Sequence, residues 1–577
     1  MEISNFKKIF PRKVILFIVV SIALLITAVA YSYYPAHSIR NNVIKFNSPD
    51  ETAAYFFTKH YAETGQLTVD EPLLAENGGH IHPRSITAIG NKLAPVTFLG
   101  LPVIYGTIGQ LIGVGAIPYM TPVFAVIALI FFYILIRRLF DLRIALVSAT
   151  LLGTHPAFWY NASRSMMPNV PFTSFLIIGL ALLVISQTKI KKDDTSKKPR
   201  VVFYYIAALM AGLAVGASLT IRFSEIVWVS GLLGLWGLVS VRRIWWLRLV
   251  PFLAGLVIPI LLFFAANKAI YGNILAGGYG LSASAGFTSQ FITTGNLVSS
   301  GAWSNITQLV KTIPATLGSY VGLLLPFGYH PKEFIQNYSD YILKMFWWYI
   351  IPVMAGAFFA LHNSFRSIAK KELPIPLAYT AIAATIGIWL VMFYGSWVFY
   401  DNISQEVTLG NSYIRYWLPL YTLAMPLAAY ALVKLAGTGR LLGKISAIAI
   451  IAIMVIYGVQ TTLWTNKESL FAIAKNIDTY HEISEKIVAL TPSDAVIVSA
   501  RSDKIVFPQR KVAVEYDFRE LDLITPIAKT GAVYYYGLWS QKDGEYISKK
   551  YFEPHGLRMV YMQPIYANEY LYHVIPL

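Results

Sequence analysis

The run "VILFIVVSIALLITAVAY", Val14–Tyr31, decides the class of the fold. About 18 apolar residues in a helix are long enough to cross the hydrocarbon core of a bilayer. Lys7, Lys8, Arg12 and Lys13 precede the run, as basic residues precede the apolar core of a signal peptide. No small-residue cleavage site follows it. We therefore expect an uncleaved first transmembrane helix with a cytoplasmic N-terminus.

The composition of the whole chain supports a membrane protein. Of 577 residues, 56% are hydrophobic and 13% are charged, and the mean hydropathy is +0.54. Soluble domains carry about 25% charged residues. The chain has no cysteine, which excludes disulfides, thiolate metal sites and cysteine nucleophiles. We predict an all-α polytopic membrane protein with about 11 transmembrane helices, or 12 to 13 if residues 93–114 and 306–326 also cross. The expected spans are residues 14–33, 117–136, 144–160, 169–187, 202–220, 224–241, 249–268, 344–361, 375–399, 412–433 and 445–464.

The distribution of charge sets the expected orientation. The net charge is +17, and the segments that these spans place inside carry 22 basic and five acidic residues. The inside segments thus account for the whole excess, as the positive-inside rule predicts, and nothing remains to indicate a nucleic-acid partner. If residues 93–114 crossed, Arg137, Arg138 and Arg143 would lie outside. We therefore expect 93–114 to lie in the interface or to re-enter.

This threading divides the chain into two domains. Residues 1–464 form the transmembrane module, with a first outer loop at 34–116 and a second at 269–343. Residues 465–577 have ordinary polarity and mixed periodicity. In this segment "EISEKIVAL" and "GEYISKKYF" indicate helices, and "DAVIVSA", "GAVYYYG" and "LRMVYMQPIY" indicate strands. We expect a small extracytoplasmic α/β domain on a protein of the plasma membrane.

The stretch "KFNSPDETAAYFFTKHYAETG", residues 45–65, opens a helix in the first outer loop. Ser48 is suited to be the N-cap, Pro49 to take the first helical position, and Glu51 to complete a capping box. These capping roles need only Ser48, Pro49 and Glu51, so they give no reason for an acid at Asp50. A carboxylate outside and close to the membrane can act as a general base toward a hydroxyl group, or hold a divalent metal. The capping and catalytic interpretations do not exclude each other.

Further along this loop, "GGHIHPRSITAIGNKLAPVTF" contains His80, His82, Arg84 and Lys92. Arginine and lysine are natural partners of a phosphate group. The alternatives are a solvated loop for the histidines and snorkelling toward the headgroups for Arg84 and Lys92. A lone His-x-His is a weak signal of a metal site. The candidate ligands of a divalent metal are Asp50, Glu51, His80 and His82.

Three further arginines stand at outer helix ends: Arg164 in "FWYNASRSMMPNVPFTSF", Arg222 in "SLTIRFSEIVW" and Arg415 in "LGNSYIRYWLPLY". Arg222 and Glu225 can pair as i, i+3 neighbours, and snorkelling also explains Arg415. Together the three arginines can line a site for an anionic lipid headgroup. The candidate residues for binding a lipid-phosphate donor are Lys92, Arg84, His82, Arg164, Arg222, Arg415 and Tyr416.

The order of these motifs resembles the GT-C membrane glycosyltransferases. It is most similar to glycosyltransferase family 39, the protein O-mannosyltransferases and the aminoarabinose transferase of lipid A. The resemblance covers about residues 10–435, and Asp50-Glu51 is its most specific element. Lys92-Leu93-Ala94-Pro95 lacks the first proline of the family's Lys-x-Pro-Pro, and Asn169 stands where the family often has an acid.

The resemblance implies a polyprenyl-phosphate sugar donor in the bilayer and inverting transfer to an extracytoplasmic acceptor hydroxyl on a protein, lipid or glycan. It also implies that Asp50 is the general base or positions the acceptor, with Glu51 in support. A transporter or lipid flippase is the alternative, although such proteins carry ionisable groups near the midplane and often contain repeats, whereas here the charges lie at helix ends. A scaffold of the cell envelope is a third alternative. A divalent metal ion is the candidate cofactor.

Overall fold

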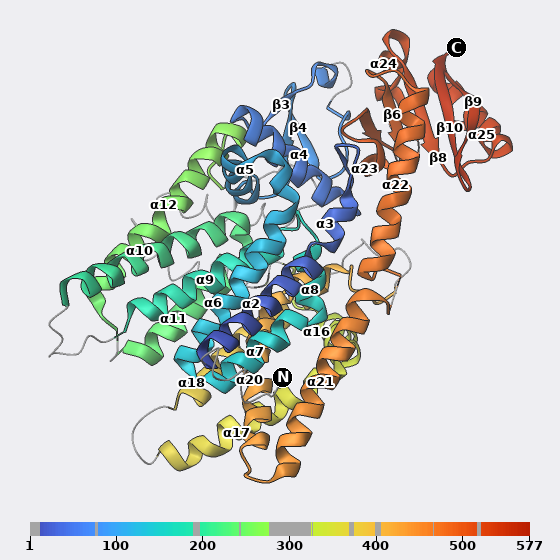
Figure 1. Cartoon of the computed structure of the whole chain (residues 1–577). Coiled ribbons are helices and arrows are strands. Elements are labelled where there is room, and N and C mark those ends of the chain that lie inside the picture. Colours follow the sequence, from blue (N-terminus) through green and yellow to red (C-terminus); the bar gives the residue numbers. More distant parts are fainter. Residues whose placement is uncertain are drawn as a thin grey trace, which may run out of the picture.

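The computed structural model describes residues 12–75, 79–188, 197–241, 244–275, 325, 327–368, 374–397, 406–465, 467–515, 518 and 521–577. These residues form a bundle of long helices followed by a smaller part that contains a sheet (Figure 1). Of the stretch 306–326, only Leu325 is described, so whether this stretch crosses the membrane lies outside the described residues.

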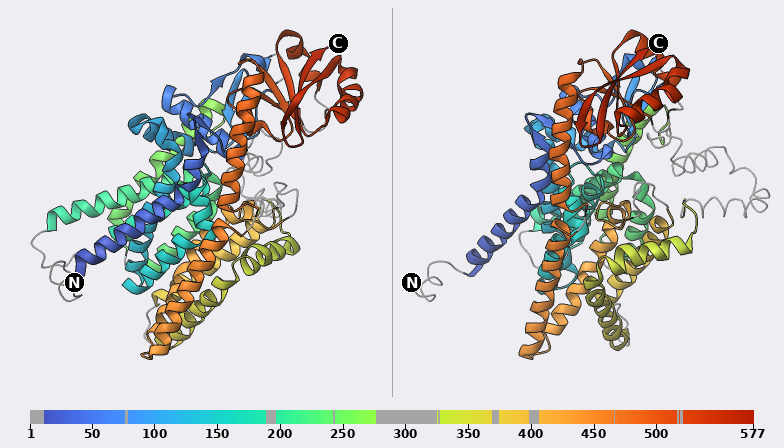
Figure 2. Two further views of the ribbon diagram at one scale, coloured as in Figure 1. Left: turned by 45° about the vertical axis from the view of Figure 1, so that its right-hand side comes forward. Right: turned by 90° about the vertical axis from the view of Figure 1, so that its right-hand side faces the viewer.

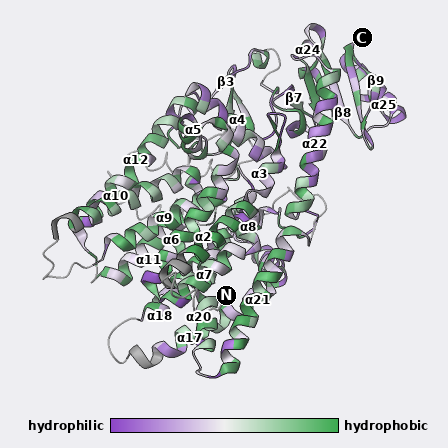
Figure 3. Ribbon diagram, viewed as in Figure 1, coloured by the Kyte–Doolittle hydropathy of each residue, from purple (hydrophilic) through white to green (hydrophobic). Residues whose placement is uncertain are grey.

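Nine helices among the described residues are long and apolar enough to cross a membrane. A tenth crossing is counted if α17 (Trp347–Ile368) is joined to α16 (Pro331–Tyr338) and the π-helical turn η6 (Ser339–Lys344), although the two parts are bent by 98°. The chain is therefore a multi-pass membrane protein, and hydrophobic residues dominate these helices (Figure 3). The nine are α2 (Arg12–Tyr31), α6 (Met120–Leu139), α9 (Asn169–Ser186), α10 (Lys197–Ile221), α11 (Ile226–Ser240), α12 (Trp246–Tyr271), α18 (Ile375–Gly395), α20 (Leu418–Ala436) and α21 (Leu441–Leu463).

The expected span 144–160 is not one helix. It is divided into α7 (Leu142–Thr154) and α8 (Pro156–Ser163). His155 between them has an extended backbone, with φ −67° and ψ 127°. The ring of a proline disfavours the helical conformation in the residue before it, so Pro156 ends α7 and begins α8.

Residues 93–114 also contain a break. Strand β5 (Lys92–Pro95) is followed by α5 (Gly100–Ile112), a helix of 13 residues. At 1.5 Å per residue, α5 is about 20 Å long, which is shorter than the ~30 Å hydrocarbon core of a bilayer. Helix α5 alone is therefore too short to cross.

Glycines allow α10 and α12 to approach closely. A Cβ atom at Gly212 would lie 1.9 Å from the carbonyl oxygen of Phe252, and one at Gly255 would lie 2.3 Å from that of Leu209. Small residues at such contacts are typical of packed membrane helices, because the backbones themselves touch. The α10–α12 contact thus depends on the absence of side chains at these positions.

The first outer loop has its own small fold. Ser48 caps α4 (Pro49–Thr64) by accepting a hydrogen bond from the Asp50 backbone at 3.2 Å, and Gly65, with φ +74°, ends the helix. Three antiparallel strands follow in the order β3-β5-β4. The remaining elements at this end are α3 (Tyr33–Ser38), β1 (Ile39–Arg40), β2 (Val43–Ile44), β3 (Val69–Asp70), η1 (Pro72–Ala75), β4 (Ile86–Ile89) and η2 (Val114–Tyr119).

The C-terminal part begins with α22 (Leu470–Leu490) and contains a five-stranded sheet in the order β7-β6-β8-β10-β9. Strand β6 is parallel to β7 and β8, and β10 is antiparallel to β8 and β9. The expected helices and strands are present, so this part is α/β. Its elements after α22 are β6 (Val496–Ser499), α23 (Asp503–Val506), β7 (Lys511–Val514), η7 (Leu521–Leu523), α24 (Thr525–Thr530), β8 (Val533–Gly537), α25 (Gln541–Ile547), η8 (Ser548–Phe552), η9 (Glu553–His555), β9 (Leu557–Tyr566) and β10 (Glu569–Pro576).

The first outer loop and the C-terminal part lie at the same end of the bundle in every view (Figures 1 and 2). They also share one hydrophobic core, in which Phe57 and Ile86 of the loop belong to the same buried cluster as Ile487 and Ile497. Helix α22 leads from α21 to this core (Figure 1). The two regions are therefore on one side of the membrane.

Candidate functional site

The two adjacent carboxylates of α4, Asp50 and Glu51, lie in different surroundings. Consecutive residues of an α-helix are about 100° apart around its axis, since 3.6 residues make one turn. Glu51 is fully buried, whereas the side chain of Asp50 is 32% exposed. Only one of the two acids is therefore open to a substrate.

Glu51 forms a buried ion pair with Arg164, the residue that ends α8. Its Oε2 atom accepts hydrogen bonds from Arg164 Nε at 2.8 Å and Nη2 at 2.5 Å, and from the Tyr34 hydroxyl at 3.2 Å. Arg164 also donates to the Tyr160 hydroxyl at 3.0 Å. The expected capping box is therefore wrong in one respect: Ser48 caps α4, but Glu51 turns away from the helix start to neutralise Arg164.

Asp50 is held by two groups from distant parts of the chain. The Ser85 hydroxyl donates to Asp50 Oδ1 at 2.5 Å, and Arg415 Nη1 lies 3.5 Å from Oδ2. Arg415 is itself fixed, since its Nη2 donates to Ser412 Oγ at 2.9 Å and its backbone carbonyl accepts from Asn169 at 3.1 Å. A fixed, partly exposed carboxylate has the arrangement needed to take a proton from a bound hydroxyl group.

Arg222 belongs to a second buried cluster, between α10 and α11. It donates to Glu225 Oε1 from Nε at 2.8 Å and from Nη2 at 2.5 Å, and to the Tyr394 hydroxyl at 3.1 Å. The Tyr394 hydroxyl donates to the same Glu225 oxygen, and Trp228 Nε1 donates to the other one at 2.5 Å. The pairing of i, i+3 neighbours expected for Arg222 and Glu225 is thus present.

The ring of Tyr416 connects the two arginines. The guanidinium carbon of Arg222 lies 4.6 Å from the ring centroid, and that of Arg415 lies 5.4 Å from it. Both distances are within the range of cation–π interactions. The structure therefore brings together Asp50, Arg415, Tyr416 and Arg222, while Arg164 is joined to the same helix α4 through Glu51.

Three other residues predicted to bind a phosphate have different partners. Arg84 donates to the buried Asp503 carboxylate, Lys92 lies 3.6 Å from Asp70 on the neighbouring strand, and His82 Nδ1 lies 2.9 Å from the Pro83 carbonyl oxygen. Burial lowers the pKa of His82, so the neutral ring is favoured.

The residues present do not fit a divalent metal. Arg164 already neutralises Glu51, and the described part of the chain has no group of three or more histidine, aspartate or glutamate side chains placed to hold an ion. Among the described residues, the candidate ligands Asp50, Glu51, His80 and His82 therefore do not form a metal cluster.

Sequence reasoning missed Ser85 and Tyr394. Ser85 follows Arg84 in a loop, has φ +64°, and contacts a residue 35 positions away. Tyr394 contacts Glu225, which is 169 positions away. The positive φ is a structural property with no signature in the sequence at a serine, and neither contact follows from local periodicity.

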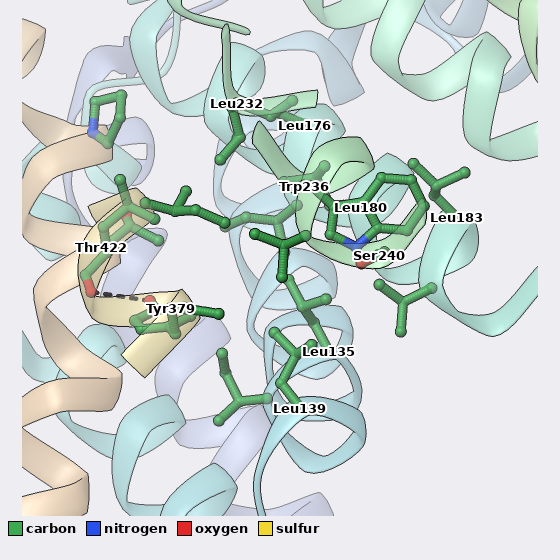
Figure 4. Close-up of a pocket in the computed structure, with 18 of the residues that line it drawn as sticks. Leu135, Leu139, Leu176, Leu180, Leu183, Leu232, Trp236, Ser240, Tyr379 and Thr422 are labelled. Atoms are coloured by element: carbon green, nitrogen blue, oxygen red, sulfur yellow. Dashed lines mark hydrogen bonds between the residues drawn. The ribbon is translucent and has the colours of Figure 1, made fainter. Parts of the chain in front are cut away.

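An apolar cavity of about 830 Å³ lies within the helix bundle (Figure 4). Helices α6, α9, α11, α18 and α20 provide its walls, which are mostly leucine, isoleucine and aromatic side chains. Trp228 is part of the wall, and its indole N–H donates to Glu225, the partner of Arg222. The cavity therefore adjoins the Arg222 cluster. Among the labelled lining residues are Leu176, Leu180, Trp236 and Tyr379.

A search of solved structures found proteins similar to this chain. The chain is similar to ArnT from Cupriavidus metallidurans bound to undecaprenyl phosphate, with a TM-score of 0.51 and 11% sequence identity over 97% of both chains. It is also similar to the Archaeoglobus fulgidus oligosaccharyltransferase in the apo form, with a TM-score of 0.47 and 12% identity over 89% of this chain and 69% of the other. No protein-family model and no curated protein sequence matches the chain. The similarity to ArnT over 97% of both chains shows that the chain has the fold of a GT-C protein.

Proposed function

We propose that this protein is a glycosyltransferase that moves a sugar from a polyprenyl-phosphate donor to an extracytoplasmic acceptor hydroxyl, with Asp50 as the general base. The observation that carries the proposal is the partly exposed Asp50 carboxylate, 3.5 Å from Arg415 and linked through Tyr416 to Arg222. A proton acceptor thus lies beside one fixed cation, Arg415, and a second cation, Arg222, contacts the same Tyr416 ring; a general base and positive charge for the leaving phosphate both favour cleavage of a sugar–phosphate bond.

The apolar cavity and the cations suit the two parts of a lipid-phosphate donor. A prenyl chain needs an apolar site within the membrane, and its phosphate needs positive charge at the membrane surface. Trp228 connects the two regions, since it lines the cavity and binds the partner of Arg222. The undecaprenyl phosphate named with the ArnT structure is a ligand of this chemical kind.

The reaction is a single displacement at the anomeric carbon. The acceptor oxygen forms a bond to C1 of the sugar, and its proton passes to the Asp50 carboxylate. The bond between C1 and the phosphate oxygen breaks, and polyprenyl phosphate leaves with the electron pair. Arg415 and Arg222 stabilise the charge that develops on the leaving phosphate. Attack opposite the leaving group inverts the configuration at C1.

The proposed side of the reaction is extracytoplasmic. The first outer loop and the C-terminal part share one side, and the excess of basic residues lies in the segments assigned to the other. By the positive-inside rule the N-terminus is then cytoplasmic and the residue 465–577 domain is outside.

The test uses the full chain in nanodiscs with undecaprenyl-phosphate-linked hexoses and pentoses, and measures release of undecaprenyl phosphate. Asp50→Asn should lower kcat by about 10²- to 10⁴-fold, the typical contribution of a general base. Asp70→Asn is the matched control, since Asp70 is an exposed acid of the same loop, and it should keep wild-type activity. Full activity of Asp50→Asn would refute the role of Asp50. Counterflow of labelled substrate without a covalent product would instead indicate a transporter.

A further inference from the structure

The short helix α23 of the C-terminal part touches the two chain segments that hold Asp50. One segment is the start of α4, and the other is the loop that contains Ser85. Two consecutive residues of α23, Asp503 and Lys504, make these contacts. The following inference rests on the proposed role of Asp50.

Asp503 fixes the loop that carries Ser85. Its carboxylate is fully buried and accepts from the Arg84 backbone N–H and from Arg84 Nε, both at 2.9 Å, and from Arg84 Nη2 at 2.5 Å. Arg84 Nη2 also donates to the Arg501 carbonyl at 2.7 Å. The next residue, Ser85, has φ +64° and donates to Asp50. A non-glycine residue in this conformation persists only where its surroundings hold it.

Lys504 fixes the other segment. Its Nζ donates to the Asn47 carbonyl at 2.5 Å and lies 4.9 Å from the centroid of the Tyr480 ring, and the Tyr480 hydroxyl donates to Asn47 Oδ1 at 3.4 Å. Asn47 directly precedes Ser48, the N-cap of α4. Burial lowers the pKa of Lys504 to about 8. Keeping its ammonium group charged at this buried position therefore costs free energy, whereas an exposed lysine has no such cost.

We propose that Asp503 and Lys504 are positioning residues that hold the Asp50 carboxylate in its reactive orientation, so that the C-terminal domain is part of the catalytic apparatus. Asp503 acts through Arg84 and Ser85, and Lys504 acts through Asn47 and the start of α4. A shift of about 1 Å in a catalytic group is enough to lower a rate by about 10²-fold.

The chain offers a matched control at the same boundary. Lys511 of β7 lies 2.7 Å from Glu71 of the first outer loop, and the two side chains are 32% and 11% exposed. This pair also joins the C-terminal part to the loop. Neither residue contacts Asp50, Ser85 or Asn47 through a described hydrogen bond. Lys511→Met should therefore weaken the boundary without moving the carboxylate.

The first experiment compares the kinetics of the variants in the transfer assay. Asp503→Asn and Lys504→Met should lower kcat by about 10²-fold with an unchanged KM for the donor, and should move the acid limb of the pH–rate profile. Lys504→Arg, which keeps the charge, should recover part of the rate. Lys511→Met should keep the wild-type kcat and pH profile. Equal losses in Asp503→Asn and Lys511→Met would overturn the proposal.

The second experiment does not depend on catalysis. The chain has no cysteine, so Asp50→Cys gives a single thiol, whose rate of reaction with a methanethiosulfonate reagent reports its surroundings. We expect this rate to change several-fold in the Asp503→Asn and Lys504→Met backgrounds and to stay constant with Lys511→Met. Equal rates in all backgrounds would refute the positioning role. If the wild type releases no polyprenyl phosphate but the labelling rates differ, the proposed glycosyl transfer is refuted, whereas the positioning of residue 50 by Asp503 and Lys504 is still supported.

Discussion

Removal of the Glu51 charge should destabilise the protein far more than removal of a comparable exposed charge. Glu51 is fully buried, Arg164 is 5% exposed, and two charge-assisted hydrogen bonds join them. Taking away one partner of a buried ion pair costs about 3–5 kcal/mol, because the other charge stays buried without compensation. Glutamine retains an acceptor oxygen for Arg164, so we expect Glu51→Gln to lower the free energy of unfolding by the lower end of this range, about 3 kcal/mol. This loss corresponds to roughly a 10²-fold decrease in the folded-to-unfolded ratio.

The assay is unfolding of the reconstituted full chain, followed by tryptophan fluorescence. Glu63→Gln on the same helix is the matched control. Its i, i+4 pair with Lys59 is 3.7 Å long and about half exposed, so its loss should cost about 0.5 kcal/mol or less. The double change Glu51→Leu with Arg164→Met should recover much of the lost stability, since no unpaired charge then remains buried. If Glu51→Gln and Glu63→Gln lower the free energy of unfolding by the same amount, the stabilising role of the buried Glu51–Arg164 pair is refuted.

Three further predictions address the fold and the donor site. Burial lowers the pKa of Lys45 to about 7, below its unfolded value, so Lys45→Met should raise the melting temperature most below pH 7, and the gain should fall as the pH rises toward 10. Gly212→Ala should cost at least 1–3 kcal/mol of unfolding free energy because its Cβ atom would meet backbone, whereas Gly234→Ala, with open space around it, should be neutral in the same melting assay. Arg222→Gln should weaken binding of undecaprenyl phosphate, measured by native mass spectrometry, by about 10- to 100-fold, as expected for one charged hydrogen bond, while the exposed Arg40→Gln should not.

Local patterns in the sequence were sufficient for the architecture. Apolar runs located the long helices, because a bilayer needs about 20 apolar residues per crossing. The ends of α4 followed from Ser48 and Gly65, whose capping roles depend on neighbouring backbone groups. The break of the expected span 144–160 at His155 also had a local sign, since Pro156 follows it. The expected span 412–433 is broken as well, at Trp417, into the helices Ser412–Tyr416 and Leu418–Ala436.

The partners of the charged residues could not be predicted in the same way. Glu51 satisfied the local rule for a capping box, yet the structure pairs it with a residue 113 positions away. Lys504 contacts Asn47 across 457 positions, and no spacing in the sequence connects the two. In a buried setting an unpaired charge costs several kcal/mol, whereas a first-turn capping interaction contributes about 1 kcal/mol, so the tertiary pair decides the conformation of Glu51.

The adjacent positions of Asp50 and Glu51 explain how one helical turn can serve both structure and the proposed chemistry. Because the two side chains leave α4 about 100° apart, Glu51 can be buried against Arg164 while Asp50 stays partly exposed beside Arg415. The buried pair fixes the rotation of α4 about its axis, since any rotation would separate Glu51 from Arg164. That rotation in turn sets the direction of Asp50, which Ser85 then refines from the neighbouring loop. The buried acid thus orients the exposed one, and the C-terminal part contacts the two segments that hold the same carboxylate, through Arg84 and Asn47.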